Sequence, residues 1–339
     1  MQTQHLTDRE EELRIAAALL RDGELVAIPT ETVYGLAADA RNGAAVASIF
    51  KAKGRPGDNP LIVHIASKEQ LTPLVAEIPP VAEALAAAYW PGPLTMIFNK
   101  APTVPDEVTA GLSTVAVRMP SHPVAQKLIQ LSGCPLAAPS ANRSGSPSPT
   151  DARRVAEDMD GRIAAIVDGG ACEVGVESTV VSVCGDRVRL LRPGAVTVAM
   201  LEAVAGSVDI DEAVLAPLRE GAEAASPGMK YKHYAPAARV VLVRGTAEAY
   251  VRYVNDKAAE GVMALCFDGE EAGLTVPYLT YGRREDPAAQ AQQVFEALRQ
   301  LDERGAALAY TACPSPEGIG LAVYNRLLRA AGFEVITLE

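Results

Sequence analysis

The chain has 339 residues, of which 49% are hydrophobic and 22% charged, and its formal net charge at pH 7 is −11. A chain of this length is expected to form two domains more readily than one. Residues 1–206 and residues 240–339 are both acidic. This excess of acidic residues argues against a protein that binds nucleic acid through a generally basic surface.

The beginning of the chain gives no sign of export. The start MQTQHLTDREEELR is polar and acidic, whereas a signal peptide is basic and then apolar. No apolar run approaches the roughly 18 to 20 residues of a membrane span, so we expect a cytoplasmic protein with no membrane partner. The five cysteines lie far apart and only four histidines accompany them, so we predict neither disulfides nor a protein metal site.

The first 206 residues alternate between two patterns. Residues 24–29, 60–65, 93–98 and 114–120 read as buried strands, and residues 42–53, 79–90 and 122–133 read as helices. Residues 178–193 form two apolar runs around a Cys-Gly-Asp turn, which predicts a hairpin. Strands joined by helices and also by a hairpin predict an α/β domain with a twisted, mixed sheet.

The rest of the chain divides into a connection and a second domain. Acidic residues, alanines and prolines interrupt the pattern over residues 207–237, which predicts an interdomain connection. Apolar runs at residues 238–245, 262–267 and 307–313 then alternate with helical stretches. We therefore predict domains at residues 1–206 and 238–339, the second being a smaller, Rossmann-like parallel sheet.

The densest local charge lies in KAKGRPGDNPLIVHI, residues 51–65. Lys51, Lys53 and Arg55 crowd into a loop shaped by glycine and proline, just before a strand that contains His64. Such a loop suits phosphate binding through charge, although a solvated basic turn explains this segment equally well. His64 alone reads as a core histidine.

Other polar groups also stand at strand ends. IPTETVYGLAADA places Thr30, Glu31 and Thr32 directly after a buried strand, where ligands bind in α/β sheets. Arg118 lies within the apolar run TVAVRMP, so it needs an anion, either an internal carboxylate or one on a ligand. Ser178 and the loop APSANRSGSPSPT also follow or begin strands, and together these groups predict one pocket.

These segments carry a family resemblance. In this order and spacing, IPTETVYGLAADA, KAKGRPGDNPLIVHI, WPGPLT, VAVRMP, APSANRSG, ESTVV and LRPGA resemble the YrdC-like domain of threonylcarbamoyl-AMP synthases. SPGMKYKHYAP, followed by a Rossmann-like domain that ends in GIGLAVYNRLLRAAG, resembles the two-domain branch of that family. The resemblance implies that L-threonine, bicarbonate and ATP give threonylcarbamoyl-AMP and pyrophosphate. Downstream transferases then move the threonylcarbamoyl group onto tRNA.

The resemblance also implies the site, with catalysis assigned to Lys53 and Arg55. The threonine site that it implies comprises Thr32, His64, Arg118, Ala138 and Ser178. The ATP site that it implies comprises Lys53, Arg55, Asn59, Thr114, Ser140, Asn142, Ser148, Arg192 and Tyr231. Phosphoryl transfer needs positioning and neutralisation of charge more than an enzyme nucleophile, so we expect magnesium with ATP and no catalytic triad.

Two expectations remain open to alternatives. The segment SPGMKYKHYAP has a Pro-Gly hinge, basic residues and Tyr231, which suit a lid that excludes water from reactive intermediates. A passive tether is the alternative. An RNA-binding or ribosome-associated module is the alternative to the synthase as a whole, and the acidic balance of both halves argues against strong RNA binding.

Overall fold

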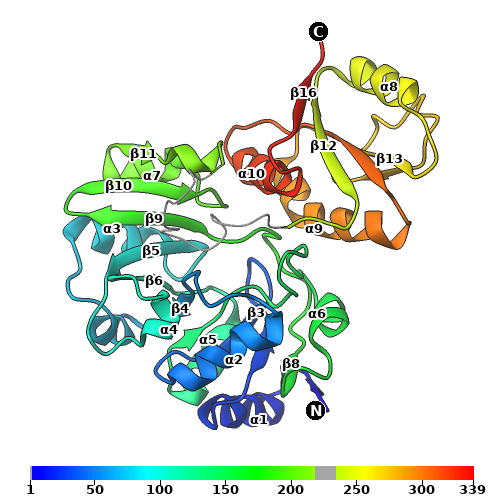
Figure 1. Ribbon diagram of the computed structural model, residues 1–339. Helices are drawn as coiled ribbons and strands as arrows, with labels where there is room; N and C mark the ends of the chain where they lie inside the picture. Colours follow the sequence, from blue (N-terminus) through cyan, green and yellow to red (C-terminus); the bar gives the residue numbers. More distant parts are fainter. Residues whose placement is uncertain (1, 218–233) are drawn as a thin grey trace. The chain divides into compact units, whose positions relative to one another are not determined.

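The computed structural model describes residues 2–217 and 234–339, which fall into two compact units (Figure 1). The first unit contains residues 2–144 and 148–214. The second contains residues 145–147, 215–217 and 234–339. Tyr231 and most of SPGMKYKHYAP lie outside the described residues, so the predicted lid stays a prediction.

The first unit is built on one large sheet. Within the described residues its strands are β1 (Gln4–Leu6), β2 (Val26–Ile28), β3 (Gly35–Asp39), β4 (Ile62–His64), β5 (Leu94–Asn99), β6 (Thr114–Arg118), β7 (Leu136–Ala137), β8 (Ala165–Val167), β9 (Thr179–Cys184), β10 (Arg187–Arg192) and β11 (Val208–Ile210). Their order across the sheet is β1-β8-β2-β3-β7-β4-β6-β5-β9-β10-β11. Parallel and antiparallel pairs both occur, which confirms the predicted mixed sheet.

The antiparallel pairing of β9 with β10 confirms the predicted hairpin. The sequence pattern gave no strand at β3, which lies inside the first sheet, or at two short strands at its edges. The polar start of the chain forms β1, which pairs in parallel with β8, and β11 lies inside the predicted connection and pairs with β10. Both occupy edges of the sheet, where little apolar patterning is required.

Helices cover both faces of this sheet (Figure 1). They are α1 (Glu10–Arg21), α2 (Gly43–Lys53), α3 (Pro80–Tyr89), α4 (Asp106–Thr109), α5 (Pro123–Ser132), α6 (Ala152–Met159) and α7 (Val198–Ala205), with short 3₁₀ turns η1 (Lys68–Gln70), η2 (Thr72–Leu74) and η3 (Glu212–Val214). Alternate residues of a strand point to opposite faces. Accordingly Ala27 of β2 packs in the core beneath α2, α3 and α7, whereas Val26 and Ile28 pack in the core beneath α1 and α5.

The second unit is a smaller sheet with helices. It contains β12 (Arg239–Arg244), α8 (Ala247–Asp256), β13 (Val262–Cys266), β14 (Tyr278–Thr280), α9 (Pro287–Glu303), β15 (Leu308–Ala312), α10 (Gly320–Ala330) and β16 (Val335–Thr337). The strand order is β14-β13-β15-β12-β16, and every strand pair of this sheet in the described chain is parallel. This arrangement confirms the predicted parallel, Rossmann-like sheet.

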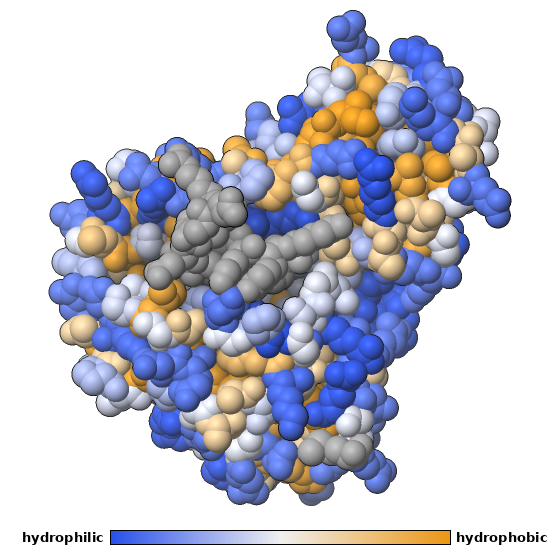
Figure 2. Space-filling view, viewed as in Figure 1, coloured by the Kyte–Doolittle hydropathy of each residue, from blue (hydrophilic) through white to orange (hydrophobic). Residues whose placement is uncertain are grey.

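The surface and the helices were compared with what a membrane-spanning chain requires. Figure 2 shows hydrophilic and hydrophobic residues interspersed over the visible face of each unit. None of the helices in residues 2–217 and 234–339 is long and apolar enough to cross a membrane.

Candidate active site

A row of polar side chains crosses the middle of the first sheet. In the register of the strands, Arg118 at the end of β6 stands opposite His64 at the end of β4 and opposite Thr95 on β5. Residues opposite each other in neighbouring strands share a face of the sheet. All three side chains are buried, with 4% or less of each residue exposed. Two predicted threonine-site residues are therefore neighbours, together with a third residue that the sequence did not single out.

Arg118 connects this row to the segment after β2. Its Nη1 donates a hydrogen bond of 2.8 Å to the hydroxyl of Thr32, and its Nε donates one of 3.3 Å to the carbonyl of Gly92. Its Nη2 lies 2.7 Å from a carboxylate oxygen of Glu31. The anion that the sequence required for Arg118 is thus present within the chain itself.

Ser178 extends the group toward the hairpin. Its hydroxyl shares a hydrogen bond of 2.8 Å with the hydroxyl of Thr95 and accepts one of 3.1 Å from Nη2 of Arg192. The Nε of Arg192 also donates to the backbone carbonyl of Ser178, at 3.0 Å. We call Thr32, His64, Thr95, Arg118, Ser178 and Arg192 the arginine group.

A second group forms where α2 ends. The helix begins after Asn42, whose side chain accepts from the N–H groups of Ala44 and Ala45, and it ends at Gly54, which adopts a left-handed conformation with φ of 64°. Glycine adopts this conformation without steric cost. The last turn of α2 thereby places Lys53 inside the unit, with 4% of the residue exposed. The chain then turns into the loop that carries Arg55.

The buried ammonium group of Lys53 organises the loop after β7. Its Nζ donates to the backbone carbonyls of Ser140 and Asn142 and lies 3.4 Å from the side-chain oxygen of Asn142. Burial, and then the charge of Arg55, hold the pKa of Lys53 well below its usual value. Arg55 itself lies over the ring of Phe50, with 5.9 Å between Cζ and the ring centre. We call Lys53, Arg55, Asn59, Ser140 and Asn142 the lysine group.

Asn59 and Thr114 stand at the amino ends of β4 and β6, whereas His64 and Arg118 stand at the carboxyl ends of the same strands. Four residues of strand span about 13 Å. Asn59 is fully buried, and its side-chain amide makes no hydrogen bond to the described part of the chain. The structure therefore separates Thr114 from Arg118 by the length of a strand, and the Asn59 amide on the segment before β4 could be satisfied by a ligand.

Ser148 and Ala138 each bond to a segment that carries a residue of the arginine group. The hydroxyl of Ser148 donates to the carboxylate of Glu177, the residue before Ser178, and the charge of Glu177 raises the pKa of Lys53 against the larger effects that lower it. The N–H of Ala138 donates a hydrogen bond of 3.0 Å to the carbonyl of Ile62, the first residue of β4.

His64 is neutral in this surrounding. Burial, and then the charge of Arg118, lower the pKa of its ring to about 3. One ring nitrogen lies 3.2 Å from the carbonyl of Ile62. A neutral imidazole can donate at one nitrogen and accept at the other, so His64 can bond a hydroxyl or an amine without adding charge.

Sequence reasoning missed three polar residues of this region. Thr95 lies in an apolar run and was read as strand only, Glu177 was given no place in the site, and Glu31 was noted at a strand end but was given no binding role. Their partners Ser178, Arg118 and Ser148 are 83, 87 and 29 residues away along the chain. A one-dimensional pattern carries no signal for such pairs, although a threonine among apolar strand residues is the kind of buried polar group that needs a partner.

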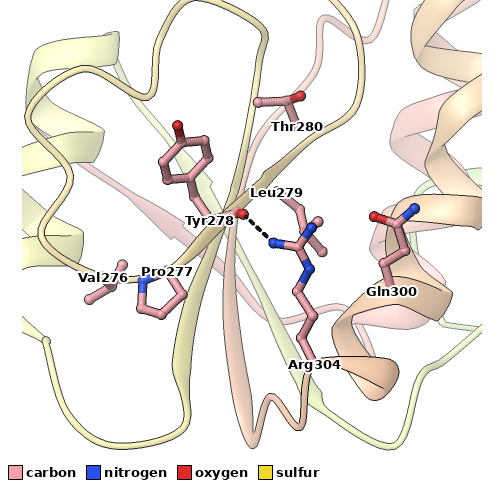
Figure 3. A pocket seen from close by; sticks show the side chains of 7 residues that line it. All are labelled: Val276, Pro277, Tyr278, Leu279, Thr280, Gln300 and Arg304. Atoms are coloured by element: carbon pink, nitrogen blue, oxygen red, sulfur yellow. Dashed lines mark hydrogen bonds between the residues drawn. The ribbon is translucent and has the colours of Figure 1, made fainter.

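A separate hollow lies at the free edge of β14 in the second unit (Figure 3). The guanidinium of Arg304 points to the backbone of this strand and donates a hydrogen bond of 3.2 Å to the carbonyl of Tyr278. The lining residues are Val276, Pro277, Tyr278, Leu279, Thr280, Gln300 and Arg304. The predicted site residues that the structure describes lie elsewhere.

Comparison with known proteins gives matches over nearly the whole chain. A family described as "Telomere recombination" matches residues 18–194, and one described as "Threonylcarbamoyl-AMP synthase, C-terminal domain" matches residues 196–332. The threonylcarbamoyl-AMP synthase of Pyrococcus abyssi (strain GE5 / Orsay) is 47% identical over 96% of each chain. The Bacillus subtilis (strain 168) enzyme of the same name is 46% identical over 98% of this chain and 97% of its own.

Solved structures agree. The crystal structure of P. abyssi Sua5 complexed with L-threonine superposes with a TM-score of 0.92 at 44% identity and covers 100% of both chains. Escherichia coli YciO, at 20% identity and a TM-score of 0.51, covers 57% of this chain and shares the fold only. The similarity at high identity therefore extends over both units.

Proposed function

Because the chain belongs to the threonylcarbamoyl-AMP synthase family, we propose that the arginine group and the lysine group bind the two organic substrates of that reaction. The reaction joins L-threonine, bicarbonate and ATP into threonylcarbamoyl-AMP and pyrophosphate. The chain is thus an enzyme, and its product is passed to downstream transferases that modify tRNA.

The arginine group, apart from Arg192, is the proposed threonine site. Arg118 binds the carboxylate, while Thr32, neutral His64 and Ser178 offer hydroxyl and ring groups to the amine and the side-chain hydroxyl. Ala138 contributes its backbone groups to the threonine site. The observation that carries this assignment is the buried row of His64, Thr95 and Arg118, since a buried cation with hydroxyl neighbours suits a small polar acid. A relative was crystallised with L-threonine, which supports the choice of ligand.

The lysine group, with Thr114, Ser148 and Arg192, is the proposed ATP site. Arg55 and Arg192 neutralise phosphate charge. The side-chain amide of Asn59, which makes no hydrogen bond within the described residues, is available to bond the nucleotide. Lys53 already bonds the segment from Ser140 to Asn142, so its proposed contribution is to hold that segment in shape. Tyr231 lies outside the described residues, and its role as part of a lid remains a prediction.

Magnesium is proposed to arrive on the phosphates of ATP. Among the described residues no group of three His, Cys, Asp or Glu side chains is placed to hold a metal ion. The described part of the chain therefore shows no metal site made of protein ligands alone. Magnesium is commonly held through substrate phosphates with few protein ligands.

The chain's own contribution is positioning. The carbamate made from threonine and bicarbonate must meet the α-phosphorus of ATP, with one of its oxygens attacking as pyrophosphate leaves. Holding two such reactants in line accounts for much of a rate enhancement, and fixed cations stabilise the charge that develops on the phosphate oxygens. This role requires no enzyme nucleophile.

The test is pyrophosphate release from the purified protein with ATP and magnesium, leaving out threonine or bicarbonate in turn. Release should require both. Arg118→Ala should mainly raise the KM for threonine and Arg55→Ala the KM for ATP, while the exposed Arg239→Ala serves as a control. The reverse pattern would contradict the assignment of the two sites. Absence of release from folded protein would favour the RNA-binding alternative.

A further inference from the structure

The ion pair between Glu31 and Arg118 is almost entirely enclosed. The side chains are 5% and 4% exposed, and a carboxylate oxygen of Glu31 lies 2.7 Å from Nη2 of Arg118. Burial opposes ionisation of Glu31, but the charge of Arg118 outweighs it and holds the pKa of this carboxyl below its usual value. Both side chains are therefore ionised, and their opposite charges cancel.

The pair is incompletely bonded. Neither carboxylate oxygen of Glu31 accepts a hydrogen bond of regular geometry from the described residues, and Nη2 of Arg118 donates none. The backbone N–H groups of Glu31 and Ser121 approach the carboxylate and lower its pKa further without reaching such geometry. Buried polar atoms normally find partners. Donor and acceptor capacity thus remains on both members of the pair.

Two other titratable groups that interact with the pair, His64 and Cys172, are neutral. His64 has a pKa of about 3, and burial raises the pKa of the Cys172 thiol, which lies within electrostatic reach of Glu31 and Arg118. A ligand with net charge would unbalance this neutral enclosure, because a buried charge without a partner is costly. A ligand that carries one positive and one negative charge would not.

We propose that Glu31 and Arg118 together form a receptor for the zwitterionic amino-acid moiety, with Glu31 binding the ammonium group and Arg118 the carboxylate. This inference rests on the threonine site proposed above. It adds a substrate-binding residue that the sequence did not assign. It also explains why Arg118 has an acidic partner, since the order Glu31–ammonium–carboxylate–Arg118 alternates in charge.

The proposal gives Glu31 a role in binding threonine and no role in the later chemical steps. The ammonium group must give up a proton to water before its nitrogen can bond the carbamate carbon, and it then carries no positive charge, so Glu31 contacts the substrate ammonium and not the later anion. An interaction lost before the transition state contributes to substrate affinity without raising kcat. Glu31→Gln should therefore raise the KM for threonine with little fall in kcat.

The first experiment uses the unaltered protein and calorimetric binding of three ligands. These are L-threonine, 2,3-dihydroxybutanoate of the same configuration, which lacks the amine, and L-threoninamide, which lacks the carboxylate. A charge-assisted hydrogen bond to a buried group corresponds to about tenfold to 100-fold in affinity. Both analogues should bind at least about tenfold more weakly than threonine. Equal affinity for threonine and the compound without the amine would overturn the proposal.

The second experiment adds variants. Glu31→Gln should weaken binding of L-threonine by about tenfold or more and leave 2,3-dihydroxybutanoate unchanged or tighter. Glu31→Asp, which keeps the charge, should recover part of the loss. Glu270→Gln, which removes a carboxylate from the Arg284 pair in the second unit, is the matched control. Equal weakening of both ligands by Glu31→Gln would mean that Glu31 only positions Arg118, and the proposal would be wrong.

The proposed threonine site has its own test. Arg118→Ala should weaken L-threonine and 2,3-dihydroxybutanoate alike. If Arg118→Ala leaves threonine binding unchanged, the site itself is misplaced, whatever Glu31 does. Melting of each variant, followed by fluorescence of Trp90, separates loss of binding from loss of fold.

Discussion

At the scale of single residues, the structure resolves one alternative that the sequence left open. Arg118 on an apolar strand required an anion, and Glu31, 87 residues earlier, supplies it. The requirement was readable because a buried cation is costly alone. The partner was not readable, because the turn after β2 meets the end of β6 only in the folded unit. The same applies to Thr95 and Ser178.

His64 makes folding stability depend on pH. The folded state keeps its ring neutral down to a pKa of about 3, while the unfolded chain takes up a proton near the ordinary pKa of about 6.5. The unfolded state then binds more protons, so stability falls as pH decreases from about 6.5 toward 3. At pH 5 this loss amounts to about 2 kcal/mol.

Melting temperatures of the protein and of His64→Gln at pH 7 and pH 5 test this linkage. The variant should lose less stability between the two values than the unaltered chain. The exposed His5→Gln is the control. Identical pH dependence for His64→Gln and the unaltered chain would show that the ring has the same pKa in the folded and unfolded states, which would contradict the prediction.

At the scale of elements, the sequence predicted most of the interior strands, although it missed β3, and it missed short edge strands. Central strands carry continuous apolar runs, and the β9–β10 hairpin is marked by its turn. By contrast, β1 and β11 were not predicted, because they are three residues long and mostly polar or exposed. Their place is set by pairing with β8 and β10, which is a property of the sheet.

The hairpin also depends on a close backbone approach at Gly194. A Cβ atom there would clash with the backbone N of Thr179 and would lie 2.8 Å from the carbonyl oxygen of Glu177. Gly194→Ala should therefore displace Ser178, cost about 2 kcal/mol of stability and raise the KM for threonine. Urea unfolding and pyrophosphate release measure the two effects.

Gly185→Ala, in the turn of the same hairpin, is the matched control. Its φ of 57° makes alanine strained, but nothing lies within 4 Å of the added methyl group. We expect a cost of about 1 kcal/mol from backbone strain and an unchanged KM. Equal effects of the two variants would contradict a specific role for the contact at Gly194.

The free edge of β14 is protected by Arg304, which occupies the carbonyl of Tyr278 (Figure 3). Exposed edges pair with other chains unless charge or cover prevents it. Arg304→Ala should increase self-association in sedimentation velocity at high protein concentration. Arg239→Ala, on a strand inside the sheet, should not. Indistinguishable profiles for both variants would mean that the edge is guarded by other features.

At the scale of the whole molecule, the alternating pattern and the break at residues 207–237 predicted an α/β chain in two parts, and the described residues do form two compact units. The domain limits at 206 and 238 remain predictions. Residues 145–147 group with the second unit although they lie within the first domain as predicted. Sequence order does not reveal such an assignment, since it depends on which neighbours a loop finds.

Substrates should stabilise the unit that holds their proposed sites. The only tryptophan in the sequence, Trp90, is buried in the first unit, so its fluorescence reports on that unit. Saturation at 100 times Kd stabilises a binding unit by about 2.7 kcal/mol. Threonine with ATP should therefore raise the Trp90 melting temperature. No shift at saturation would place the sites outside the first unit.

The segments of the arginine group have a consequence for synthesis of the chain. Thr32 lies near the start of the first unit and Arg192 near its end, and the hydroxyl of Ser178 bonds both Thr95 and Arg192. Contacts between residues so far apart form late and slowly. A chain leaving the ribosome therefore cannot complete this pocket before the residues around position 192 have emerged, so we expect substrates to stabilise longer nascent chains more than shorter ones.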